Sequence, residues 1–426
     1  MSNLARSAVS LAASAVAALT FGLASTSASA VDFDGYFRTG PGLTSKDAAR
    51  ACYDLGGMSG GHYRLGNECD LYGEFGLAQT GTTEGVAWKA KVMFNEYNGG
   101  TDVGTSASSF EQMYVEGKGF DIAPGTNFWI GKRFYGRKDV HILDTFFVRM
   151  DGVGAGADQI DIGGAKLGVA YFGSDTGAGF GDAGNGLAKN PGSRFNIDVT
   201  DIPLNAGGAL RITGTFTQGR FDDPIPVPTP VPNTHVGVGT SGFGLSLQHT
   251  QDIAAIGGGN TLWLQYAQGS AGLDGNFGTM TAESSVKKWR LVESLGWQVG
   301  ELGGQAVALF GQHDQDVING TAKYTEVSIG GRGSYALTKN FKLVAELGYM
   351  QKKPDGSETQ KLTKFTFAPT LSAGPGFWSR PELRLYVTTA KWNDAANAAS
   401  GLGGLTGLGN GKTSGTSFGA QAEIWF

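Results

Sequence analysis

The sequence predicts a transmembrane antiparallel β-barrel, and three observations lead to this fold class. Apolar and polar residues alternate along many short segments, 70 of the 426 residues are glycine, and no apolar run of about 18 residues follows the first 30. Alternation is typical of barrel strands, which point one side chain to lipid and the next to the interior. Closed barrels are, besides helices, the only structures that satisfy every backbone polar group within lipid.

The first 30 residues are expected to be a removable export signal before one barrel domain at 31–426. Arg6 provides a positive charge, residues 7–22 are small and apolar, and Ala28-Ser29-Ala30 is an A-x-A cleavage site. Export and the barrel pattern together predict the bacterial outer membrane as the destination. The formal net charge of −5 argues against a nucleic-acid partner, which would require a basic face.

The length of the chain predicts a wide barrel. Removing 30 of 426 residues leaves 396, and a membrane strand takes about 10 residues with a connection of similar length, which gives roughly 16–20 strands. A barrel of that width has a lumen open to solutes unless part of the chain folds into it. Export also reaches a compartment where disulfides persist, so Cys52 and Cys69, the two cysteines, can form one bridge.

The alternation of apolar and polar residues is clear in three segments within the sequence and in the C-terminal segment. The apolar positions of the inner segments are Val86, Trp88, Ala90, Val92 and Phe94, then Phe195, Ile197 and Val199, and then Leu210, Ile212 and Phe216. The last segment has an apolar face formed by Phe418, Ala420, Ala422, Ile424 and Phe426. A terminal strand that closes on an aromatic residue is typical of outer-membrane barrels.

Two connections have a low-complexity composition. Residues 222–242 hold five prolines within nine positions, which no barrel strand tolerates, so a stiff surface loop is expected there. Residues 395–416 are rich in glycine, alanine and serine, and we expect a flexible outer loop.

Four aromatic residues share a strand face with charged or polar residues. Tyr36 is in phase with Asp34 and Arg38, Tyr72 with Asp70 and Glu74, Trp378 with Arg380, Glu382 and Arg384, and Trp425 with Glu423 and Gln421. A single such ring could belong to the aromatic girdle at the membrane interface. Four of them favour a lumen that binds sugars, because the apolar face of a pyranose stacks on a ring while its hydroxyls bond to charged groups.

The segment at 131–144, GKRFYGRKDVHILD, is unusually rich in ionisable residues. A charge run is usually a solvated loop. Within a wide barrel, the same run can form a polar constriction, and both interpretations remain open on these residues alone.

The sequence resembles maltoporins along the mature chain. The resemblance is carried by VDFDGYFRTG from Val31, YRLGNECDLYGE at 63–74, GKRFYGRKDVHILD at 131–144, FWSRPELRLYVTTAKW at 377–392 and the closing FGAQAEIWF. It implies an 18-stranded antiparallel barrel, a homotrimer, and a third loop at 131–144 that folds inward. It also implies that Cys52 and Cys69 pair within the first outer loop.

The resemblance further implies a maltose and maltodextrin channel in which sugars bind an aromatic slide flanked by a polar track. The slide would consist of Tyr36, Tyr72, Trp378 and Trp425, with Phe146 at the constriction. The track would consist of Arg38, Arg64, Glu74, Glu111, Arg137, Asp139 and Asp144. Lipid and lipopolysaccharide would surround the barrel, and the outer loops could serve as phage receptors.

This chain departs from the maltoporin pattern at four places. Phe146 stands where the family has a constriction tyrosine, and Glu111 stands where it has an arginine of the track. The region at 101–109 lacks the tryptophan that the second loop lends to a neighbouring subunit, and a phenylalanine of the slide falls near Leu262, beside Trp263 in the opposite phase. These departures leave the preferred sugar and chain length open.

Other functions remain as alternatives. A barrel enzyme would need a nucleophile and a base at the rim, but none of the five histidines, His62, His141, His235, His249 and His313, belongs to a recognisable constellation. His141 is expected to be a constriction or structural histidine. No cofactor or metal site is expected.

A plugged adhesin, a porin for sucrose or a monosaccharide, and a general diffusion porin are the remaining candidates, although a sucrose porin would be expected to carry an N-terminal coiled-coil extension.

Overall fold

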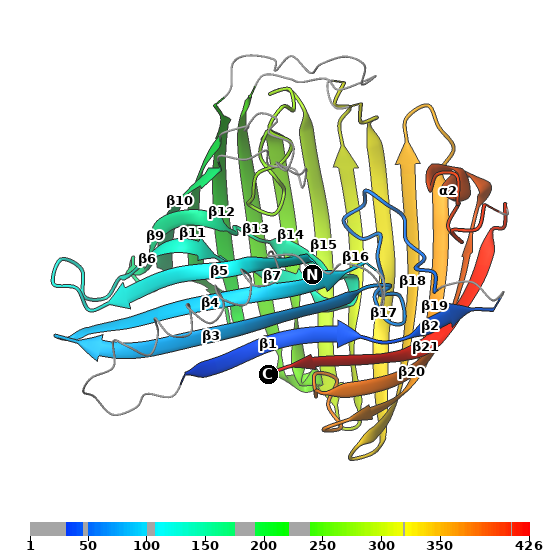
Figure 1. The fold of residues 1–426 in the computed structure, drawn as a ribbon. Helices are drawn as coiled ribbons and strands as arrows, with labels where there is room; N and C mark the ends of the chain where they lie inside the picture. Colours follow the sequence, from blue (N-terminus) through cyan, green and yellow to red (C-terminus); the bar gives the residue numbers. More distant parts are fainter. Residues whose placement is uncertain are drawn as a thin grey trace, which may run out of the picture.

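The computed structural model is a closed antiparallel β-barrel with two long connections inside it (Figure 1). It describes residues 31–45, 50–99, 107–174, 192–220, 239–317, 320–409 and 411–426. The expected export signal at 1–30 lies outside the described residues. The same holds for most of the second-loop region at 101–109 and for the prolines of the connection at 222–242.

The barrel wall is built from long strands that follow one another along the chain. Their bounds are β1 (Asp32–Thr39), β2 (Gly42–Thr44), β3 (Leu71–Thr83), β4 (Val86–Asn98), β5 (Ala107–Lys118), β6 (Asn127–Arg133), β9 (Gly152–Asp161), β10 (Lys166–Ser174), β11 (Gly192–Asn205), β12 (Gly208–Gly219), β13 (Ser241–Ile253), β14 (Gly258–Gly269), β15 (Lys287–Val299), β16 (Leu302–His313), β17 (Tyr324–Thr338), β18 (Phe341–Pro354), β19 (Gln360–Ser372), β20 (Glu382–Trp392) and β21 (Ser414–Trp425).

Each wall strand pairs antiparallel with the next, and β1 pairs with β21 to close the barrel. β1 and β2 both pair with β21 and are separated only by Gly40 and Pro41, so they form one broken strand. The described residues therefore form an 18-stranded barrel, which confirms the predicted fold class. β7 (Lys138–Val140) and β8 (Thr145–Val148) form a separate hairpin.

The predicted alternation is present in the wall. Along β20, Leu383 and Leu385 are exposed on the outside, whereas Glu382 and Arg384 between and beside them are buried inside. The same holds for Phe195 and Phe216, which point outward from β11 and β12. Lipid-facing apolar side chains thus alternate with polar lumen side chains, as the pattern predicted.

No helix among the described residues is long and apolar enough to cross a membrane.

The first long connection, whose described part is 50–70, runs inside the barrel and not over its outer rim. The Leu65 amide donates to Glu346 Oε1 at 2.9 Å, Lys364 Nζ donates to the Leu65 carbonyl at 2.8 Å, and Thr388 Oγ1 donates to the Gly66 carbonyl at 3.1 Å. The predicted Cys52–Cys69 disulfide is present, with the Cα atoms 6.0 Å apart. This inward course was not predicted from the sequence, and it arises because buried polar groups on the lumen wall need partners and the loop backbone provides them.

The third long connection folds into the lumen, as predicted, but it begins later than expected. β6 continues to Arg133, so the first three residues of the 131–144 segment belong to the wall and the inward loop spans 134–151. Phe147 of this loop is fully buried and packs its ring against Trp263, with centroids 5.3 Å apart. The Ile142 amide donates to Gln305 Oε1 at 3.2 Å. These contacts fix the loop to strands β14 and β16.

The connection between β20 and β21 is partly folded, contrary to the expected flexible loop. It contains the helix α2 (Asp394–Ala399), whose N-cap Asn393 accepts a hydrogen bond from the Ala396 amide at 3.1 Å. Asn397 Oδ1 accepts from the indole of Trp392 and from the Leu405 amide, at 3.1 and 3.2 Å. These side-chain bonds order a segment whose composition alone indicates flexibility.

Candidate functional site

A cavity of about 490 Å³ lies where the inward loop faces strands β1, β3 and β21. Eleven of the twelve predicted site residues line it, and the twelfth, Trp378, lies beside it. The lining residues are Tyr36, Arg38, Arg64, Asp70, Tyr72, Glu74, Tyr97, Glu111, Arg137, Asp139, His141, Asp144, Phe146, Arg149 and Trp425. Residues spread over almost the whole sequence therefore meet at one place in the lumen.

Aromatic rings from neighbouring strands form a row along this cavity. Tyr72 of β3 and Tyr36 of β1 have ring centroids 6.3 Å apart. Tyr36 is the direct cross-strand partner of Trp425 on β21, and the Trp425 ring lies 6.4 Å from that of Trp378. We call Tyr72, Tyr36, Trp425 and Trp378 the aromatic row.

Trp378 reaches the row from a turn and not from a strand. β20 begins only at Glu382, so the strand phase used to place Trp378 inside does not apply to it. The turn is held by its neighbour Phe377, which is buried and whose amide donates to Gln298 Oε1 at 2.8 Å. Trp378 itself is exposed and touches His141 edge-on, with centroids 5.3 Å apart.

Two arginines beside the row are held by several carboxylates. Arg38 bonds both oxygens of Asp70, at 3.1 and 2.9 Å, and reaches Asp144 on the inward loop at 3.0 Å. Arg64, from the first loop, pairs with Glu68 at 2.7 Å and with Glu423 at 3.2 Å. The guanidinium groups are thereby fixed in position, because bidentate and multiple ion pairs leave them little freedom.

Asp144 links the inward loop to both arginines. Its φ of 50° lies in the left-handed region, which costs energy for a residue other than glycine. Burial raises the pKa of Asp144, but Arg64 and Arg38 more than offset this, so its pKa lies below the ordinary value. The carboxylate therefore stays charged over the physiological range and keeps the two loops together.

The lowered pKa of Asp144 predicts an acid-resistant ion pair. A carboxyl group with a lowered pKa keeps its contribution above its ordinary pKa, about 3.9, and loses it as the pH falls through the lowered value. We expect the conductance difference between the wild type and Asp144→Asn to stay constant from pH 7 to about 4 and to vanish only below. Single-channel recordings across this range test it, and a difference that fades between pH 7 and 5 would contradict it.

His141 completes the contact between the two inward loops. It is buried, and both this burial and the nearby Arg64 lower its pKa well below the ordinary value. The neutral ring accepts a hydrogen bond at Nδ1 from Arg64 Nη1 at 3.2 Å and contacts Trp425 edge-on. The sequence-based expectation of a constriction histidine agrees with this position.

Glu111 reaches the cavity through a β-bulge. The register of β5 against β4 shifts between the pairs Gln112–Met93 and Phe110–Phe94, which leaves Glu111 without a partner in the ladder. Bulges redirect side chains in this way and are frequent next to functional sites. Within the described residues, the Glu111 carboxylate accepts one side-chain hydrogen bond, from Ser109 Oγ at 3.0 Å.

The remaining polar residues lie on the inward loop and on β3. Arg137 pairs with Asp151 at 2.8 Å through Nε and lies over the Phe146 ring at 4.7 Å. The Tyr72 hydroxyl donates to Glu74 Oε1 at 2.5 Å. The cavity therefore presents guanidinium groups and carboxylates along the row of rings.

Sequence reasoning did not name four of the lining residues as site residues: Asp70, Tyr97, His141 and Arg149. The alternation of side chains along a strand could have placed the first two in the lumen. Asp70 lies on the same strand face as Tyr72. Tyr97 lies on the same face as Lys91, which donates a hydrogen bond to Asp34 in the lumen. Arg149 belongs to the inward loop, where no such periodicity applies. Near the position where the maltoporin resemblance places a further phenylalanine of the slide, Leu262 lies on the lipid-facing side of β14, and Trp263 packs under the inward loop.

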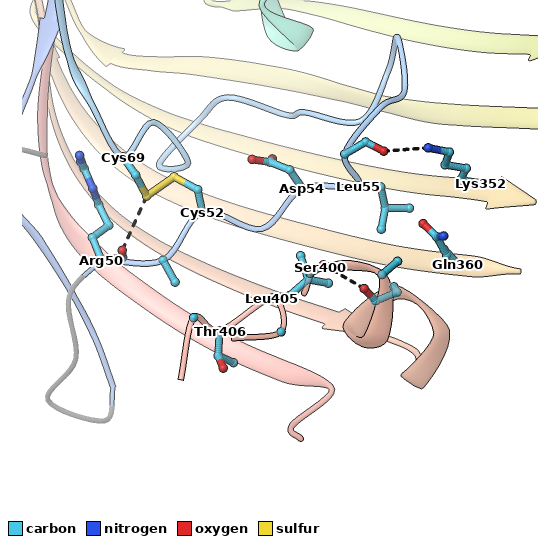
Figure 2. Close-up of a pocket in the computed structure, with 16 residues that line it drawn as sticks. Arg50, Cys52, Asp54, Leu55, Cys69, Lys352, Gln360, Ser400, Leu405 and Thr406 are labelled. Atoms are coloured by element: carbon cyan, nitrogen blue, oxygen red, sulfur yellow. Dashed lines mark hydrogen bonds between the residues drawn. A yellow bond between two sulfur atoms is a disulfide. The ribbon is translucent and has the colours of Figure 1, made fainter. Parts of the chain in front are cut away.

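A larger cavity of about 760 Å³ lies between the first loop and the β20–β21 connection (Figure 2). The disulfide, Leu55 and Lys352 face Ser400 and Leu405 across it, and Lys352 Nζ donates to the Gly56 carbonyl at 3.1 Å. No aromatic residue is among its described lining residues. The cavity along the aromatic row is therefore the candidate functional site.

Among the described residues, no group of three or more His, Cys, Asp or Glu side chains is arranged to hold a metal ion. The site consists of rings, arginines and carboxylates, which suit a neutral polyhydroxylated ligand or small ions.

Comparisons with known proteins agree with this architecture. The model of the family described as LamB porin matches residues 31–426. The fold is similar to Pseudomonas aeruginosa OccK2 (OpdF), at 10% sequence identity and a TM-score of 0.52, over 93% of this chain and 97% of that chain. Acinetobacter baumannii OccAB2 matches at 11% identity and a TM-score of 0.49, over 93% of this chain and 98% of that chain.

At 10% identity, the similarity to OccK2 supports the barrel fold alone. The family match covers every described strand and both inward loops. This chain therefore belongs to the LamB porin family and forms a channel in the bacterial outer membrane.

Proposed function

We propose that the channel is selective for sugars and carries maltose and maltodextrins by facilitated diffusion along the aromatic row. The observation that supports this most strongly is the row itself. Four rings from β3, β1, β21 and the turn before β20 follow one another beside a cavity lined by arginines and carboxylates.

The chemistry of a glucose chain fits this arrangement. The C–H face of each pyranose stacks on a ring, and its hydroxyls exchange hydrogen bonds with Arg38, Arg64, Glu74 and Asp144. Because Arg38 and Arg64 both pair with Asp144, a neutral sugar can bond to these three groups without leaving their charges unpaired. Conduction requires weak binding, and a dissociation constant near 1 mM, about −4 kcal/mol, suits a channel.

Sugar block in a planar bilayer tests the proposal. Ion current through the purified protein is recorded while glucose, sucrose and maltose through maltohexaose are titrated. We expect saturable block that tightens with the length of the maltodextrin, since longer chains cover more rings. Block by sucrose or a monosaccharide alone would show that the channel carries another sugar than maltodextrins. No block by any sugar would indicate a general diffusion pore.

Trp378→Ala is expected to weaken maltodextrin affinity by roughly tenfold, because one stacking contact is worth about 0.5–1.5 kcal/mol beyond its buried area. Trp425→Ala should act in the same direction. Open-channel conductance should change little, since the exposed Trp378 ring binds solute without closing the lumen. Sugar block and conductance are measured on the same channels.

Tyr335→Ala serves as the control for Trp378→Ala, because Tyr335 is exposed on the outer wall of β17. It should leave both quantities unchanged. A Trp378→Ala channel that lost conductance but kept its sugar affinity would refute a stacking role.

We further propose that residues 1–30 are removed on export and that the mature chain forms a homotrimer within lipid and lipopolysaccharide, as the maltoporin resemblance implies. N-terminal sequencing of the purified protein should begin at Val31, and light scattering in detergent should give three chains per particle. We also propose that the protein is a channel without enzymatic activity, and that its outer loops are the surface available to phage.

A further inference from the structure

We propose that Tyr97 forms an additional, outermost sugar-binding position, so that the aromatic row continues from Tyr72 onto β4. This inference rests on the proposed function and names a residue that extends it. Tyr97 lines the same cavity as Tyr72, Tyr36 and Trp425.

The strand register places Tyr97 next in the row. Tyr97 is the direct cross-strand partner of Tyr72, and such partners have Cβ atoms about 4.5–5.5 Å apart. Trp425, Tyr36, Tyr72 and Tyr97 thus supply one ring each from the successive strands β21, β1, β3 and β4. Tyr97 is also the last residue but one of β4, at the end that leads into the long connection to β5.

The environment of Tyr97 leaves its ring available to a ligand. The residue is 44% exposed although it points into the lumen, and its side chain makes no hydrogen bond to another described residue. By contrast, the hydroxyls of Tyr72 and Tyr36 donate to Glu74 and Glu423. A ring that has no structural partner in the described part of the chain and lines a binding cavity is suited to stacking.

Polar groups for sugar hydroxyls lie along the same wall. The bulged Glu111 on β5 lines the cavity with Glu74 on β3, and β4 lies between these strands. A pyranose on the Tyr97 ring would therefore find carboxylate acceptors on either side. Because Tyr97 is at the outer end of the row, it would bind maltodextrins that enter from the outside. It would also bind maltodextrins that are long enough to reach it while they occupy the inner rings.

The test is Tyr97→Ala, compared with Tyr97→Phe and Tyr171→Ala, in the sugar-block assay. Tyr97→Phe keeps the ring, and Tyr171 is a matched control because it is 47% exposed on the outer face of β10. We expect Tyr97→Ala to weaken maltohexaose affinity roughly three- to tenfold and maltose affinity much less. Tyr97→Phe and Tyr171→Ala should behave like the wild type.

A second measurement separates a binding role from a general disturbance of the barrel. Maltohexaose is added to one side of an oriented channel at a time, and its association rate is taken from current fluctuations. Tyr97→Ala should slow association from the outer side and leave association from the inner side unchanged. If wild-type channels are blocked but Tyr97→Ala affects neither long chains nor outer entry, this inference is wrong while the proposed function stands. Absence of block in the wild type would instead overturn the proposed function.

Discussion

Glu423→Gln is expected to lower the free energy of unfolding by about 3–5 kcal/mol, the cost of breaking a buried ion pair by removing one partner. Glu423 is fully buried and pairs with Arg380 at 2.9 Å, with Arg64 at 3.2 Å, and also with Arg384. Neutralising the Glu423 carboxylate would remove the anionic partner that the three guanidinium groups share. Because all three ion pairs depend on this carboxylate, its loss should destabilise the barrel more than the loss of a single pair.

The midpoint of urea unfolding in detergent measures this effect, with heat-dependent mobility on gels to show that the barrel has folded. Glu301→Gln is the matched control, because Glu301 is exposed in the turn between β15 and β16. It should leave the midpoint unchanged. Equal midpoints for both variants would show that the arginines around Glu423 find other partners or water.

Replacing residues 134–151 with an Asn-Gly turn is expected to raise conductance severalfold and to abolish sugar block. Arg133 and Gly152 are cross-strand partners, so a two-residue turn can join β6 to β9 without changing the wall. The replacement removes the inward loop and with it Arg137, Asp139, Asp144 and Phe146 from the cavity. The lumen of an 18-stranded barrel would then be restricted mainly by the first loop.

Single-channel recordings of this variant measure both quantities. Trypsin resistance and heat-dependent gel mobility serve as controls for folding, because the loop also buries Phe147, Val148 and Met150. A folded variant with unchanged conductance would show that the first loop, and not the 134–151 loop, sets the size of the pore.

Strand phase predicted the wall of this barrel and much of its site. In a strand the side-chain period is two, so the charged neighbours of Tyr36, Tyr72 and Trp425 were enough to place these rings inside. The structure brings them together along one cavity. Trp378 lies beside Trp425, but strand phase is not the reason, since a turn with no fixed period carries it.

The inward course of the first loop could not be predicted from local pattern. Its position depends on Glu346, Lys364 and Thr388, which lie roughly three hundred residues further along the chain. The bulge that turns Glu111 into the lumen is likewise set by pairing between strands and not by its own neighbours. The maltoporin resemblance named Arg64 and Glu111, and the structure gives the physical reason for their positions.

The place where the barrel closes has a consequence for assembly. Tyr36 stands on the first strand and Trp425 on the last, so the aromatic row crosses the seam at which the two ends of the sheet meet. Contacts between such distant parts of a chain form late, because the loop-closure entropy must be overcome first. Sugar affinity should therefore appear only when the seam is complete, and an open sheet in the membrane, however many strands it had formed, would leak ions without recognising a carbohydrate.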